Sequence, residues 1–79
     1  MSNLDGLLDQ IGVEARDAAK GIGIARQTLW RIARGKQEPT RPVIVRTLSF
    51  LNRPENLKRL GRKRPLSFEE VFGQAGRAA

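Results

Sequence analysis

ARDAAKGIGIARQTLWRIAR, residues 15–34, carries the spacing from which the architecture of this chain can be predicted. Gly23 lies near its centre, and Ala19, four residues earlier, is small enough for a second helix to cross close by. Leu29 and Ile32 follow the glycine by six and nine residues and share one helical face. Because each of these requirements is steric, together they predict two helices that meet at a glycine corner.

Apolar residues flank this corner, and the glycines mark the helix ends. The spacing predicts a helix over residues 14–20, whose buried side is Val13, Ala18 and Ala19. Gly21 and Gly23 together indicate the turn, which Ile22 and Ile24 seal. A second helix restarts near Ala25 and ends at Gly35, with Leu29, Ile32 and Ala33 facing inward. The residues expected to face outward are Arg26, Gln27, Trp30, Arg31 and Arg34.

Four further helices are predicted by periodicity and capping signals. Residues 4–11 follow a cap at Ser2 or Asn3, and residues 54–60 bury Leu57 and Leu60. Residues 68–72 follow a capping box made by Ser67 and Glu70. The remaining helix runs from a Thr40 cap to Leu51 and carries an apolar stripe of Val43, Ile44, Thr47, Leu48 and Leu51.

The expected fold is therefore all-α. It is a small bundle of about five helices over residues 1–61 with a helix-turn-helix, followed by a short C-terminal helical extension. Residues 62–79 form a basic linker and that extension, and the composition after Gly73 predicts disorder. Phe68, Val71 and Phe72 are interpreted either as closing the monomer core or as a dimer contact, with the dimer contact preferred.

The chain lacks the residues that several classes of enzyme and metal-binding protein need. The 79 residues include no Cys and no His, which removes thiol chemistry, the usual zinc ligands and the commonest general base. No carboxylate pair, nucleophile–base pair or phosphate-binding loop is recognisable, so we expect no enzyme, no cofactor, no metal and no small-molecule substrate. No apolar run reaches the length of a membrane span, and the N-terminus has no secretion-signal pattern, so we expect a cytoplasmic protein without a membrane partner.

Charge is distributed unevenly along the chain, whose formal net charge is +7. Residues 1–19 hold four acidic residues and one base, whereas residues 20–64 hold thirteen bases and only two acids. A solvated surface usually mixes its charges more evenly. This segregation predicts a basic face turned toward nucleic acid.

Residues 23–39, GIARQTLWRIARGKQEP, resemble the recognition helix and following loop of Cro-like and lambda-repressor-like helix-turn-helix DNA-binding proteins. The resemblance covers residues 4–51, and extends to Leu60 if the fifth helix is included. It implies that Ala25, Arg26 and Gln27 approach base edges, with Arg31 one turn further along. Arg pairs well with guanine and Gln with adenine, which agrees with these positions.

The other assignments concern phosphates and neighbouring surfaces. The predicted phosphate contacts are Arg16, Arg34, Lys36 and Arg41, with help from backbone N–H groups near residues 14 and 40. Trp30 either contacts the DNA or packs against Pro39 and its loop. The bases interpreted as an ordinary solvated face are Arg46, Arg53, Lys58 and Arg59, and the run 62–64 is interpreted as a plain linker or a DNA-touching arm.

These features predict a sequence-specific regulator of transcription that binds double-stranded DNA as a homodimer. It would act by occupying its operator in a bacterial nucleoid or a phage-infected host, because no effector domain is recognisable. Activation would require a contact with RNA polymerase, for which the acidic N-terminal region is the candidate. The alternative is an excisionase-like architectural or recombination accessory protein that assembles along DNA.

Overall fold

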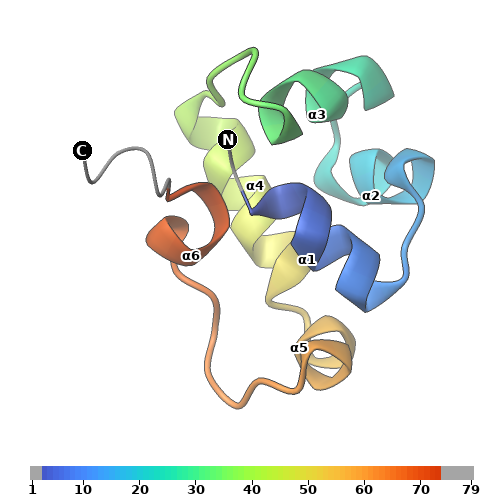
Figure 1. The fold of residues 1–79 in the computed structure, drawn as a ribbon, viewed down its shortest axis with the longest axis vertical. Helices are drawn as coiled ribbons and strands as arrows, with labels where there is room; N and C mark the ends of the chain where they lie inside the picture. Colours follow the sequence, from blue (N-terminus) through green and yellow to red (C-terminus); the bar gives the residue numbers. More distant parts are fainter. Residues whose placement is uncertain (1–2, 74–79) are drawn as a thin grey trace.

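The helices follow one another with short connections and wrap around one shared core (Figure 1). The computed structural model describes residues 3–73, so the expectations about a Ser2 cap and about the chain beyond Gly73 lie outside the described residues. Within that range every regular element is a helix, which confirms the all-α prediction. The elements are α1 (Leu4–Ile11), α2 (Ala15–Ile22), α3 (Arg26–Ala33), α4 (Arg41–Leu51), α5 (Pro54–Leu60) and α6 (Phe68–Phe72).

The core takes apolar side chains from five of these helices and from one loop. Leu4, Leu29 and Leu51 are its largest fully buried aliphatic residues, at 0%, 2% and 0% exposure. The remaining apolar members come from the inner faces that 3.6-residue periodicity predicts for α1, α2 and α3, and from α4, α6 and the α5–α6 loop. They are Leu8, Ile11, Ala18, Ala19, Ile22, Ile32, Ala33, Phe50, Leu66, Val71 and Phe72.

Helix α2 is longer than its sequence predicts. Gly21 and Ile22 belong to the helix. Of the two glycines at the corner, it is Gly23 that adopts the left-handed conformation, with φ of 90°. Gly21 is needed for space, because a Cβ there would lie 2.6 Å from Cε1 of Phe50 on α4. The prediction of a turn at Gly21 was wrong, since the glycine serves a helix–helix contact that local rules do not reveal.

The stability of a Gly21→Ala variant distinguishes the close contact with Phe50 from the effect of helix propensity. Propensity alone favours the alanine variant by about 1 kcal/mol. Because the buried ring of Phe50 blocks the added methyl group, we expect the free energy of unfolding to fall by ~1–3 kcal/mol instead. Urea denaturation measures the sign. In a Phe50→Leu background, Gly21→Ala should cost less stability than it does in wild type. A Gly21→Ala variant more stable than wild type would contradict the close contact between Gly21 and Phe50.

Helices α4 and α5 differ from prediction in which side chains they bury. Phe50 is buried although the predicted stripe omits it, and Val43, Ile44 and Leu48 are only half-buried. On α5, Leu57 and Leu60 are half-buried, while Asn56 is 5% exposed. Asn56 is accommodated because its Nδ2 donates a hydrogen bond of 2.7 Å to the Phe50 carbonyl.

The C-terminal segment belongs to the same core as the rest of the described chain. Leu66, Val71 and Phe72 are buried, and α6 packs against α1 and α4 (Figure 1). Residues 66–72 are therefore part of the domain, not an extension beyond residue 61. Val71 and Phe72 close the monomer core, which corrects their preferred assignment to a dimer contact, and only Phe68 stays substantially exposed, at 44%.

Polar contacts hold α6 and the preceding loop in place. The Ser67–Glu70 capping box is present, as predicted. Asn3 donates from its backbone to the Val71 carbonyl and from its side chain to the Glu70 carbonyl, both at 3.0 Å. Asn52 pairs with the backbone of Leu66 in both directions, at 2.6 and 3.1 Å. Residues far apart in sequence thus fix the position of α6 and of the loop before it.

The Glu70 carboxylate makes this attachment sensitive to pH. The backbone N–H of Ser67 lowers its pKa, and Arg62 at 2.7 Å lowers it further. Because the folded pKa lies below the unfolded value, the carboxylate stabilises the fold above the unfolded pKa, and this contribution is lost as pH falls through the folded pKa. We expect wild type to melt above Glu70→Gln at neutral pH, with the two melting temperatures converging in acid. Parallel curves would contradict this role.

Candidate nucleic-acid interface

Helix α3 has two faces of opposite character. Leu29, Ile32 and Ala33 point into the core, at 2–3% exposure. The side chains on the other face are all exposed, as the sequence predicts: Arg26, Gln27, Trp30, Arg31 and Arg34. Ala25, the N-cap residue, is exposed as well. Of the five predicted base-contacting residues, none is packed inward.

The corner between α2 and α3 sets how α3 stands on the domain. Gly23 ends α2 by donating to the Ala19 carbonyl at 2.8 Å, and Ile24 donates to the same carbonyl at 3.0 Å. The positive φ of Gly23 would strain any residue with a Cβ. Ala19 is 2% exposed and Ile24 is half-buried, so the predicted small residue and apolar seal are both in place.

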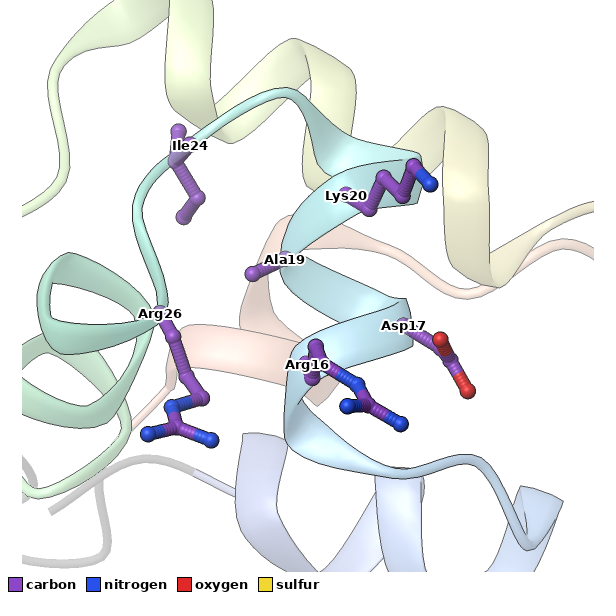
Figure 2. Close-up of a pocket in the computed structure, with 6 residues that line it drawn as sticks. All are labelled: Arg16, Asp17, Ala19, Lys20, Ile24 and Arg26. Carbon is purple, nitrogen blue, oxygen red and sulfur yellow. The ribbon is translucent and has the colours of Figure 1, made fainter.

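An open groove of about 600 Å³ runs between α2 and the start of α3 (Figure 2). Figure 2 shows Arg16 and Lys20 projecting from α2 and Arg26 from the first position of α3. Asp17 is the one acidic residue among the lining residues, which also include Ala19 and Ile24. The groove is therefore lined by three cations and one anion, a charge balance that attracts phosphates.

A second, more apolar groove of about 420 Å³ lies on the α1 side of α3. Arg26 lines this groove as well as the first one, so both grooves border its side chain. The other lining residues are Asp5, Leu8, Ala15, Gln27, Leu29 and Trp30. The start of α3 therefore has a depression on each side, a shape that can enter a wider groove in a ligand.

Trp30 lies under two cations at the C-terminal end of α3. Trp30 is 48% exposed, and the Arg34 guanidinium and the Lys36 ammonium lie 5.3 and 5.7 Å from its ring centroid. Arg34 also forms an ion pair of 3.4 Å with Asp5 of α1. Exposed pairs of this kind contribute only ~0–1 kcal/mol, so a phosphate can displace Asp5 at little cost.

The other predicted phosphate contacts are exposed. Arg16 forms an ion pair of 3.6 Å with Glu14, in which both side chains are 74% exposed. Lys36 and Arg41 are exposed on the loop after α3 and at the start of α4. Thr40 is the N-cap of α4 as predicted, but its side chain makes no capping hydrogen bond.

Sequence reasoning missed two cations near the corner. Lys20 lines the α2–α3 groove. Arg46 of α4 is exposed, as interpreted from sequence, and its Nη1 lies 3.7 Å from where a Cβ of Gly23 would be. A signal for Arg46 exists, because it lies one turn before Phe50, whose ring packs on Gly21. Both cations extend the basic surface beside α3.

Comparisons of the chain with protein-family models, with curated proteins and with solved structures found no match. Over residues 3–73, no three His, Cys, Asp or Glu side chains are grouped so as to hold a metal ion. None of the helices in that range has the length and apolar character needed to cross a bilayer.

Proposed function

We propose that this protein binds double-stranded DNA in a sequence-specific manner and regulates transcription by occupying its operator. The α2–corner–α3 unit acts as a helix-turn-helix of the Cro-like and lambda-repressor-like type, with α3 in the major groove. The observation that carries the proposal is the position of Arg26, which is exposed at the first turn of α3 and lines the grooves on both sides of it.

Side chains at the start of α3 supply the base recognition in this arrangement. Arg26 and Gln27 are the first two residues of α3, and Arg31 follows Gln27 by one helical turn on the same exposed face. Arg can donate to both O6 and N7 of guanine, and Gln can pair with N6 and N7 of adenine. Since the major groove of B-DNA is ~12 Å wide, it admits a helix of this kind.

Cations beside α3 hold the phosphates and set the register. Arg16 and Lys20 line the α2–α3 groove, and Arg46 lies at the corner. At the C-terminal end of α3, Arg34 and Lys36 bind phosphates after they give up their contacts with Trp30 and, for Arg34, with Asp5. These contacts add affinity for any sequence, because phosphates carry no sequence information.

Selection of bound duplexes from a random pool tests the proposal directly. We expect enrichment of a short motif whose best duplex binds at least ~10³-fold tighter than random DNA at physiological salt. Single-stranded DNA and RNA of matched length serve as competitors. A pool that stays random after repeated rounds, or equal binding of RNA, would contradict sequence-specific duplex recognition.

We further propose that the regulator acts as a homodimer on a two-fold operator, with Phe68 in the contact. Phe68 is the exposed aromatic residue of α6, whereas Val71 and Phe72 are committed to the core. We expect Phe68→Glu to shift the sedimentation equilibrium toward monomer without changing the circular dichroism spectrum. An unchanged dimer mass in that variant would place the contact elsewhere.

A further inference from the structure

We propose that the end of the domain opposite α3 binds the phosphate backbone of a second double-stranded DNA segment, so that one protein molecule bridges two duplexes. This inference rests on the proposed function, because it takes α3 as the site of the first duplex. We call the surface the α5 basic end and define it by Lys58, Arg59, Lys63 and Arg64.

The charge of this surface is largely uncompensated. Residues 53–64 contain six bases and a single acid, Glu55. Arg62 is paired with Glu70 at 2.7 Å and is 29% exposed, so its charge is neutralised. The four residues of the α5 basic end are exposed, and none of the ion pairs found within residues 3–73 involves them.

The backbone under these cations is held firmly. Asn56 anchors α5 by its buried hydrogen bond to the Phe50 carbonyl. The loop after α5 is fixed at its far end by the two hydrogen bonds between Asn52 and Leu66, and Arg62 ties it to α6. Because this backbone is already fixed, it loses little entropy when the surface binds a polyanion, which favours binding.

The position of the surface separates it from the interface at α3. In Figure 1, α5 and the loop after it lie at the opposite end of the molecule from α3, along its longest extent of 30 Å. The screening length at physiological salt is only ~8 Å, so these cations add little to the attraction of a duplex on α3. A short duplex cannot wrap from one end to the other, because DNA is stiff over ~150 base pairs.

A two-duplex capture assay tests the proposal. A duplex that carries the selected sequence is immobilised, and a labelled random duplex of ~14 base pairs, little more than one helical turn, is offered in solution. The variant replaces all four residues of the α5 basic end by Gln, and the matched control exchanges Lys58→Arg, Arg59→Lys, Lys63→Arg and Arg64→Lys. Circular dichroism checks that both variants are folded.

We expect wild type and the control to capture the labelled duplex. The four-Gln variant should bind the immobilised duplex as wild type does but lose capture by at least about tenfold, because each lost phosphate contact weakens binding. Capture that survives in the four-Gln variant would overturn the proposal and indicate bridging by a dimer. Binding of poly-glutamate at this end without capture of a second duplex would overturn it in favour of an acidic protein partner.

The same assay distinguishes failure of this inference from failure of the proposed function. If the four-Gln variant loses the immobilised duplex while Arg26→Ala retains both affinity and preference, DNA binds at the α5 basic end and not at α3. That result would overturn both proposals. Loss of preference in Arg26→Ala together with unchanged capture in the four-Gln variant would overturn only the second duplex.

Discussion

Arg26→Ala should bind the selected operator no better than a sequence altered at the one base pair that Arg26 contacts. The side chain is exposed at the start of α3, so its removal should leave the fold unchanged. A bidentate contact between Arg and guanine provides ~1–3 kcal/mol of discrimination, which corresponds to a ~5- to 150-fold preference. Competition titrations with the two duplexes measure this preference in the variant and in wild type.

Arg16→Ala is the matched control, because it removes the same charge from the other wall of the α2–α3 groove. It should weaken binding to every duplex alike and reduce the dependence of log K on log salt by ~0.9, while the sequence preference stays. If the two variants lose affinity in the same uniform way, Arg26 contacts a phosphate, and base recognition by the start of α3 is wrong.

Phe72→Ala should remove most of the stability of the domain. Phe72 is 8% exposed, and truncation of a buried Phe costs ~3–5 kcal/mol. A small domain has little stability to lose, and total values begin near ~5 kcal/mol. We therefore expect a broad or missing thermal transition for this variant, measured by circular dichroism.

Phe68→Ala provides the comparison on the same helix. Phe68 is 44% exposed, and its ring centroid lies 5.3 Å from that of Phe72. At protein concentrations where the chain is monomeric, this variant should lose only the ring pair, ~0.5–1.5 kcal/mol. Equal losses in the two variants, or a loss for Phe72→Ala that disappears at high protein concentration, would mean that α6 packs against another molecule and not against its own core.

Local patterns predicted much of this fold. The bounds of α1, α5 and α6 follow directly from apolar spacing with a glycine stop or a capping box. The outward face of α3 was predicted correctly as well, because Leu29, Ile32 and Ala33 define the inward face at helical spacing. Both results depend on relations within about one or two turns of helix, which a sequence displays openly.

Other features were missed for reasons of the same kind. The buried Asn56 looks like a surface residue until the Phe50 carbonyl is placed beside it. Arg46 is exposed, as interpreted from sequence, but its place beside the glycine corner follows only from the packing of α4 against α2. In each case the environment of the side chain is made by a residue on another helix, and no periodicity within its own helix reveals it.

By itself, the sequence determined the helical class, the glycine corner and the set of cationic side chains that α3 displays, because backbone conformation and helical spacing are local. Tertiary structure alone decided that Gly21 is helical, that α6 joins the core, and that the bases of α5 lie far from α3. Those outcomes depend on which helices share a core, and burial of apolar surface between distant segments settles that choice.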